Sequence, residues 1–170
     1  AVVPHAEDVP TLIRAYEVKG YFDELLDLLE SALGLERAHM GVFTQMGIAL
    51  AQYRPERLME YLKLYWSRSN LPPLIKVTDK AHLWRELVFL YTKYDEPDNA
   101  ALTIMEHCSD AWDHDQFKAV LPQVANVEIY YRALTFYLEQ HPLLLNDLLT
   151  VLVKRIDHAR VVRMFKKHDH

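Results

Sequence analysis

The sequence contains one cysteine, Cys108, among its 170 residues. A single thiol cannot form an internal disulfide, and it cannot build a zinc site that needs several cysteine ligands. Disulfide frameworks are typical of oxidising compartments, whereas a lone thiol fits a reducing one. We therefore expect neither a disulfide-stabilised secreted domain nor a multi-cysteine metal site.

Glycine is also scarce, with only 4 residues. The glycine-rich loops that hold phosphates, GxGxxG and GxxxxGK[ST], do not occur, and neither do the GxSxG nucleophile elbow and the HExxH zinc motif. These absences argue against a nucleotide-binding loop, an α/β-hydrolase and a metalloprotease. The sequence predicts no catalytic residues, no metal ligands and no cofactor-binding residues.

Long apolar runs and an excess of one charge are missing as well. No window of about 18 residues is uninterruptedly apolar, so no segment is expected to insert directly into a bilayer. The start, "AVVPHAEDVP", lacks the basic and apolar regions of a signal peptide. With 19 basic and 24 acidic residues, the net charge of −5 leaves no electrostatic footprint for nucleic acid.

Hydrophobic residues, in contrast, make up 51% of the chain, and they recur at helical spacing. In "IYYRALTFYLEQHPLLLNDLL" (129–149) they form one apolar stripe before Pro142 and a second stripe after it. Tyr131 and Phe136 lie off the first stripe, so a second face is also apolar. Proline cannot continue the hydrogen-bond ladder. This stretch therefore predicts a helical hairpin whose helices have neighbours on more than one side.

The rest of the chain follows the same pattern, with Pro55, Pro72 and Pro97 close to expected helix starts. The pattern predicts ten or eleven helices, no convincing strand and an all-α fold. The expected helices lie near 9–19, 21–33, 40–53, 56–68, 73–80, 83–94, 98–108, 115–124, 127–140, 143–154 and 158–167.

Internal repetition favours a stack of hairpins over a compact bundle. Residues 12–30 can be aligned with 87–106, and 133–152 follows the same plan: a late tyrosine, a tight turn and a leucine-rich second helix. Such repeats bury their faces against both neighbours. We expect residues 1–170 to form a single α-solenoid segment of stacked antiparallel hairpins without a second domain. Five pairs would extend on the order of 50 Å, as a fragment of a longer solenoid.

The strongest candidate for chemistry is "HCSDAWDHD" (107–115), which gathers histidine, cysteine and aspartate. A zinc site or a nucleophile would need three or four of these side chains to converge. The alternative is that His107 ends one helix and that Asp110 or Asp113 caps the next. We favour the capping interpretation, because the spacing matches no compact ligand set. Stoichiometric zinc that is abolished by His114→Ala would favour an enzyme on a helical scaffold instead.

Four basic residues lie close together in the sequence: Arg54 and Arg57 around one turn, and Lys63 and Arg68 on the following helix. They form either a docking strip for an acidic helix or a solvated face. The nine histidines are interpreted as capping and solvated positions, although they could make packing between rods sensitive to pH. The three tryptophans, Trp66, Trp84 and Trp112, are interpreted as core rather than as exposed anchors for a partner.

Several longer runs are similar to the clathrin heavy chain, in order and spacing, in the proximal part of its leg. The resemblance extends from about His5 to Phe165, with Pro73 and Lys154 as apparent departures. It rests on "ALGLERAHMGVFT" (32–44), "YWSRSN" (65–70), "AHLWRELVFLYTKYDEPDNA" (81–100), "DAW" (110–112), "VANVEIYYRAL" (124–134), "FYLEQHPLLLNDLLTVL" (136–152) and "DHARVV" (157–162).

The resemblance implies a clathrin heavy-chain repeat that acts as a structural coat scaffold and not as an enzyme. Its implied partners are the clathrin light chain and other clathrin heavy chains, through triskelion and lattice contacts. It also implies a cytoplasmic location on coated pits and coated vesicles of the plasma membrane and trans-Golgi network, peripheral to the membrane through adaptors. The alternative is a helical-repeat subunit of a vesicle tethering or sorting complex.

An acidic light chain would complement a basic surface. Four residues near successive turns are therefore predicted to contact it: Arg54, Arg57, Lys63 and His141.

Overall fold

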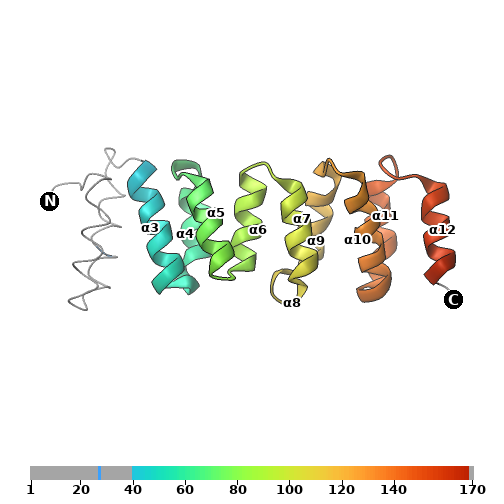
Figure 1. Cartoon of the computed structure of the whole chain (residues 1–170), viewed down its shortest axis with the longest axis horizontal. Helices are drawn as coiled ribbons and strands as arrows, with labels where there is room; N and C mark the ends of the chain where they lie inside the picture. Colours follow the sequence, from blue (N-terminus) through green and yellow to red (C-terminus); the bar gives the residue numbers. More distant parts are fainter. Residues whose placement is uncertain (1–26, 28–39, 169–170) are drawn as a thin grey trace. The chain divides into compact units, whose positions relative to one another are not determined.

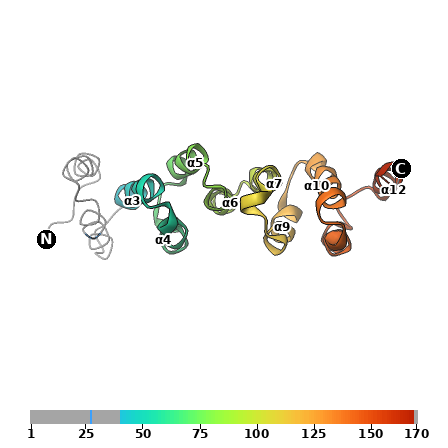
Figure 2. The ribbon, with the colours of Figure 1, turned by 90° about the horizontal axis from the view of Figure 1, so that it is seen from below.

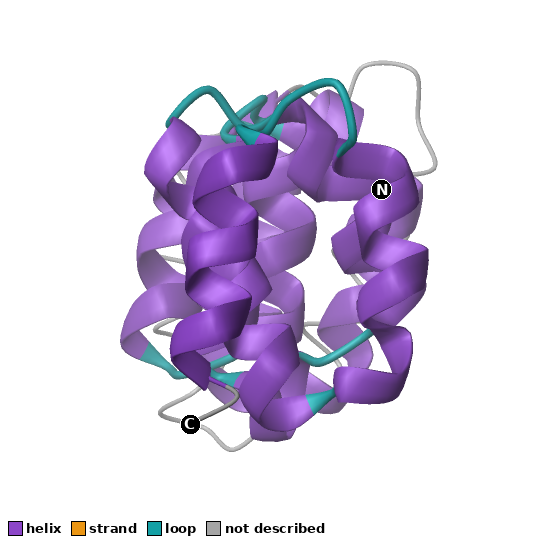
Figure 3. Ribbon diagram, turned by 90° about the vertical axis from the view of Figure 1, so that its right-hand side faces the viewer, coloured by secondary structure: helices purple, strands orange, loops and turns teal. Residues whose placement is uncertain are grey.

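A computed structural model of the chain describes residue 27 and residues 40–168. Helices joined by short loops make up the whole of residues 40–168, without a strand in that range (Figure 3). The predicted all-α fold is therefore confirmed. The expected helices 9–19 and 21–33, and the repeat 12–30, lie outside the described residues.

The chain divides into two compact units, Ala1–Glu86 and Leu87–His170. In the first unit, α3 and α4 form a helical hairpin and α5 packs beside α3 (Figure 1). The described elements of this unit are α3 (Met40–Tyr53), the 3₁₀ turn η1 (Pro55–Arg57), α4 (Leu58–Tyr65), the turn η2 (Trp66–Arg68) and α5 (Leu71–Lys80), followed by α6 (Trp84–Lys93), which spans the division.

In the second unit, α7 and α10 lie in one row and α9 and α11 in the other (Figure 2). Helix α10 is in contact with α7, α11 and α12. After α6 the elements are α7 (Pro97–Glu106), α8 (Cys108–Ala111), α9 (His114–Val120), η3 (Leu121–Gln123), α10 (Val127–Gln140), η4 (Pro142–Leu144), α11 (Leu145–Leu152) and α12 (His158–His168). The prediction that residues 1–170 form one continuous solenoid segment remains a prediction.

The predicted helices and the observed ones agree closely. Helices α3 and α10 have the bounds that the periodicity predicts, and prolines occupy the first turns of η1, α5, α7 and η4. A proline there loses no helical hydrogen bond, because its nitrogen has no intrahelical partner at that position. The one-turn helix α8 was not predicted, since four residues are too few to show a period.

The first unit has an apolar core between α3, α4 and α5. Gly47 on α3 faces Leu74 on α5, and a Cβ atom at position 47 would lie 2.7 Å from the Leu74 Cδ2 atom. A side chain at position 47 would therefore require the buried Leu74 side chain to shift. The fully buried side chains around this contact are Phe43, Met46, Leu50, Leu58, Leu62 and Leu74.

Polar bonds to the backbone fix the helices of the first unit relative to one another. The Tyr61 hydroxyl on α4 donates to the Phe43 carbonyl on α3 at 2.6 Å, and burial raises the pKa of that hydroxyl. The hydroxyl of Thr44 accepts from the Asn70 N–H at 2.8 Å, at the start of α5. Each bond joins residues at least eighteen positions apart, and thus sets the position of one helix along another.

The second unit uses the same kind of contact. The Asp98 carboxylate, in the first turn of α7, accepts from the backbone N–H groups of Ala125 at 2.9 Å and Asn126 at 3.1 Å. The Asn126 side chain caps α10 by accepting from the Glu128 N–H at 3.1 Å. The buried Tyr130 hydroxyl donates to the Val124 carbonyl. The loop that precedes α10 is therefore bonded at both ends.

The apolar stripes predicted on either side of Pro142 are buried. Tyr137 and Leu148 are fully buried, and Tyr131, off the main stripe, is only 5% exposed. Helix α10 therefore has neighbours on more than one side, as its sequence predicts. Leu143, in the 3₁₀ turn η4 between the two stripes, is 97% exposed.

Two tyrosines test the backbone bonds. We expect Tyr61→Phe to lower the free energy of unfolding by about 1 kcal/mol, because a buried hydrogen bond is lost while the ring remains. Tyr94→Phe is the matched control, since Tyr94 is 45% exposed, and should change the stability by less than about 0.5 kcal/mol. Urea unfolding followed by circular dichroism measures both; equal effects would contradict the role given to the Tyr61 hydroxyl.

Two leucines five positions apart test the assignment of the core. Leu148→Asp places a carboxylate in the apolar interior, and we expect it to cost more than about 4 kcal/mol. Leu143→Asp makes the same chemical change at an exposed turn and should leave the midpoint of thermal unfolding nearly unchanged. An unshifted midpoint for Leu148→Asp would show that α11 does not pack as described.

Candidate interaction surface

Three of the four predicted contact residues lie in the first unit, at the turn between α3 and α4 and on α4 itself. Arg54 is half-exposed, and its guanidinium Nη1 donates to the Tyr53 carbonyl at 3.0 Å. Arg57 ends the 3₁₀ turn and is exposed. Lys63 is exposed on α4. All three are thus accessible, as docking requires.

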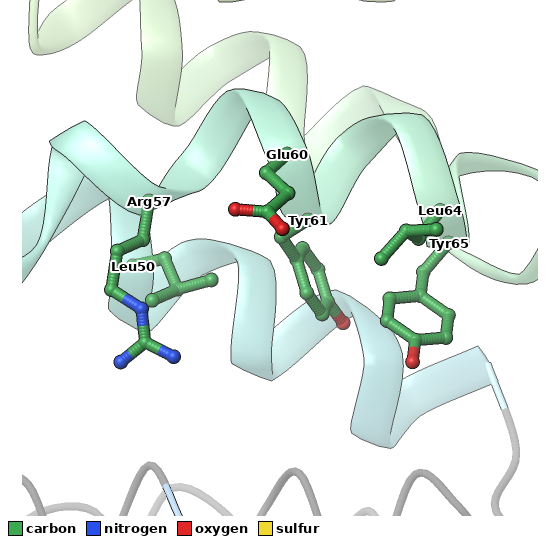
Figure 4. A pocket seen from close by; sticks show the side chains of 6 residues that line it. All are labelled: Leu50, Arg57, Glu60, Tyr61, Leu64 and Tyr65. Atoms are coloured by element: carbon green, nitrogen blue, oxygen red, sulfur yellow. The ribbon is translucent and has the colours of Figure 1, made fainter.

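A groove of about 300 Å³ runs along α4 (Figure 4). Arg57 and Leu50 lie at one end and Leu64 and Tyr65 at the other, with Glu60 and Tyr61 between them. Lys63 does not line the groove, because it lies on another face of α4. The lining includes charged, aromatic and aliphatic groups, among them Leu64 at 65% exposure. Such a surface suits an amphipathic helix better than a small polar substrate.

An aromatic cluster that the sequence analysis did not single out supports this region. The Tyr65 ring lies 5.3 Å from that of Phe43 and 5.0 Å from that of Tyr61, measured between centroids. The Arg68 guanidinium lies over the Phe43 ring at 4.2 Å. Arg68 thus makes a cation–π contact. The spacing of Tyr61 and Tyr65, one helical turn apart, is the signal that predicts their contact.

His141, the fourth predicted residue, lies in the second unit at the C-terminus of α10. Its ring stacks on Trp112, with centroids 4.2 Å apart and planes at 5°, and its backbone N–H donates to the Tyr137 carbonyl at 2.8 Å. Trp112 also contacts Phe136 at 5.3 Å between ring centroids. Trp112 is half-buried rather than fully in the core. That His141 shares one docking strip with Arg54, Arg57 and Lys63 remains a prediction.

A polar network of four side chains lies beside this stack, and the sequence analysis did not predict it. His114 bonds through Nδ1 to the Tyr137 hydroxyl at 2.7 Å and through Nε2 to Asp147 Oδ2 at 2.8 Å. Lys118 Nζ donates to the same Asp147 oxygen at 2.8 Å. Burial raises the pKa of Tyr137, so its hydroxyl stays protonated and can donate to Nδ1. Where the Tyr137 hydroxyl donates to Nδ1, Nε2 is the nitrogen that donates to Asp147.

Helix ends account for two more residues of the "HCSDAWDHD" cluster, beside His114 in the network. His107 ends α7, and the Asp113 carboxylate caps α9 by accepting from the Gln116 N–H at 3.1 Å. The capping interpretation is therefore confirmed for these two residues. Within residues 40–168 and Asp27, no three histidine, cysteine, aspartate or glutamate side chains are grouped so that they could hold a metal ion. Among those same residues, no helix is both long and apolar enough to cross a membrane.

Asp147 generates a prediction about acid stability. Hydrogen bonds from Lys118 and His114 hold the pKa of this carboxyl below its ordinary value. A lowered pKa in the folded state means that the stabilisation is present at neutral pH and is lost as the pH falls through that pKa. We expect Asp147→Asn to lower the midpoint of thermal unfolding at neutral pH, and the difference from wild type to shrink in acid. Asp110→Asn is the matched control, because its carboxylate forms no ion pair within residues 40–168; an equal loss of stability in the two variants at neutral pH would contradict the network.

Comparison with known proteins gives consistent matches. The chain is 55% identical over 166 residues to probable clathrin heavy chain 1 of Caenorhabditis elegans, covering 98% of this chain and 10% of that protein. It is 54% identical over 168 residues to the probable clathrin heavy chain of Schizosaccharomyces pombe, with 99% and 10% covered. The clathrin heavy chain of Drosophila melanogaster is 52% identical over 166 residues, with 98% and 10% covered.

The chain thus spans about a tenth of the length of the curated relatives that it matches. These matches confirm the resemblance to the clathrin heavy chain that the sequence motifs predict. The family model described as "Region in Clathrin and VPS" matches residues 1–145 of the 170. The chain therefore belongs to the clathrin family defined by that region.

Proposed function

We propose that this chain is a structural segment of a clathrin heavy-chain leg, and that its parent protein builds the coat of vesicles in endocytosis and intracellular transport. The observation that carries the proposal is identity of 52–55% over 98–99% of the chain with proteins named as clathrin heavy chains. The same observation favours this function over the alternative of a tethering or sorting subunit.

The physical character of the two units supports a scaffold. A buried hydrogen bond from Tyr61 to Phe43 joins two helices of the first unit. Two hydrogen bonds to the Asp98 carboxylate join α7 to the loop before α10. Among the titratable groups that meet in the described residues, His114 and Lys118 bind Asp147 of α11, and Arg160 of α12 binds Glu128 of α10, so these contacts hold helices together. We therefore propose a role without catalysis, in which the surfaces of the segment bind other proteins.

The proposed partners are the clathrin light chain and other clathrin heavy chains, on the cytoplasmic face of coated pits and vesicles. Light-chain docking is proposed at Arg54, Arg57, Lys63 and His141. The groove beside Arg57 supports the proposal, because it carries a cationic group at one end and the exposed Leu64 at the other. An acidic amphipathic helix needs both kinds of contact.

Titration of the chain with recombinant clathrin light chain, by calorimetry and gel filtration, tests this proposal. We expect saturable one-to-one binding, weakened about tenfold by the double variant Arg54→Glu and His141→Glu through loss of about 1.4 kcal/mol. Lys76→Glu with Arg85→Glu is the matched control, since both residues are exposed and the change in charge is the same.

Circular dichroism must show unchanged helicity in all variants, because His141 also stacks on Trp112. Undiminished binding by the folded Arg54 and His141 variant would show that these two residues are misassigned. No binding by the folded wild-type chain would place light-chain docking elsewhere on the heavy chain.

A further inference from the structure

Charge is distributed unevenly along the second unit. Residues 94–117 contain seven acidic residues and no lysine or arginine, whereas residues 154–167 contain six lysines and arginines and a single acidic residue, Asp157. The acidic residues of the first segment are Asp95, Glu96, Asp98, Glu106, Asp110, Asp113 and Asp115. The chain as a whole carries a net charge of −5, so the segment 154–167 stands out as its basic part.

Helix α12 packs against α10. Val161 is 7% exposed, and the Arg160 guanidinium donates two bonds to the Glu128 carboxylate, at 2.8 Å and 2.7 Å. The same guanidinium lies over the Tyr131 ring at 3.8 Å from its centroid. Because Glu128 and Tyr131 both belong to α10, these contacts hold the orientation of α12.

Away from the buried Val161, α12 presents Arg163, Lys166 and Lys167, which together we term the basic face. Helical spacing of about 100° per residue places all three away from Val161 and Phe165. All three are exposed, and none forms an ion pair with another residue of the part of the chain that the structure describes. Three cations are thus held in place and left available.

The acidic corner, as we term it, consists of Asp110 on α8, Asp113 immediately before α9 and Asp115 in the first turn of α9. All three are exposed. Asp113 accepts from a backbone N–H, which leaves its negative charge in place. No ion pair joins the acidic corner to the basic face within residues 40–168.

We propose that the basic face of α12 docks on the acidic corner of a second copy of this chain. Two different surfaces of one molecule that are complementary to each other give a heterologous, head-to-tail contact, which can repeat from copy to copy. The contact would be weak, since exposed ion pairs contribute little each, and a scaffold of identical legs adds many of them. An anionic bilayer would attract the basic face but repel the acidic corner of the same unit, whereas a second copy uses both.

The inference deepens the proposed scaffold function, on which it rests, by naming a surface for contacts between copies. It is tested by sedimentation velocity of the chain without light chain, so that its outcome is separate from the light-chain titration. We expect self-association in about 0.1 M salt, where charges act over about 10 Å, and dissociation in about 1 M salt, where they act over about 3 Å.

Charge reversal identifies the two surfaces. Arg163→Glu, Lys166→Glu and Lys167→Glu together should weaken self-association at least about tenfold at low salt, and so should Asp110→Lys with Asp115→Lys. Mixing the two variants should restore a heterotypic complex, because the reversed charges again attract at the reversed surfaces. Lys76→Glu, Lys80→Glu and Arg85→Glu, an equal charge change at exposed positions of the first unit, should leave self-association unchanged.

Three results would overturn the inference: a monomer at low salt, association that the variants do not affect, or no recovery on mixing. Vesicles that contain phosphatidylserine are the remaining probe. Binding to them that the triple variant of α12 abolishes, together with a monomeric chain, would assign the basic face to a lipid surface instead.

Discussion

Buried tyrosine hydroxyls must find hydrogen-bond partners, and this requirement organises both units. A ring that fills the space between two helices carries its hydroxyl to the far side, where an unpaired oxygen would be costly. Tyr61 reaches the Phe43 carbonyl, Tyr130 the Val124 carbonyl, and Tyr137 the His114 ring. Tyr131 accepts from the Asp157 N–H at 2.7 Å. Each tyrosine thus joins two segments by apolar contact and by one directed bond.

The sequence predicts the helices well because their apolar residues are periodic and their ends carry prolines. α3 and α10 follow the predicted bounds, and the turn at Pro142 lies where a missing N–H ends the helix. α8 was not predicted, because its four residues are too few to show a helical period. The stripe that includes Tyr137 and Leu148 also predicts the core, since residues one turn apart share a face.

The candidate surface is less predictable from sequence, because its parts come together only in three dimensions. Arg54 and Arg57 are recognisable as basic residues near a turn, but the groove beside Arg57 depends on Leu50 from the preceding helix. His141 was selected for charge complementarity, while its stacking on Trp112 depends on a residue 29 positions away. The contact of His114 with Asp147, 33 positions apart, has no local signal in the sequence at all.

The way Asp98 holds the next hairpin has a consequence for how such a chain can change over generations. Its carboxylate accepts from two backbone N–H groups, those of Ala125 and Asn126, and these bonds use no side chain of the loop before α10. Any residue except proline supplies that N–H, so position 125 is free to drift while the attachment persists. Substitution at position 98, in contrast, removes both bonds at once. The contact therefore depends on the side chain at one position only, and the residues that supply its N–H groups can change to suit new partners.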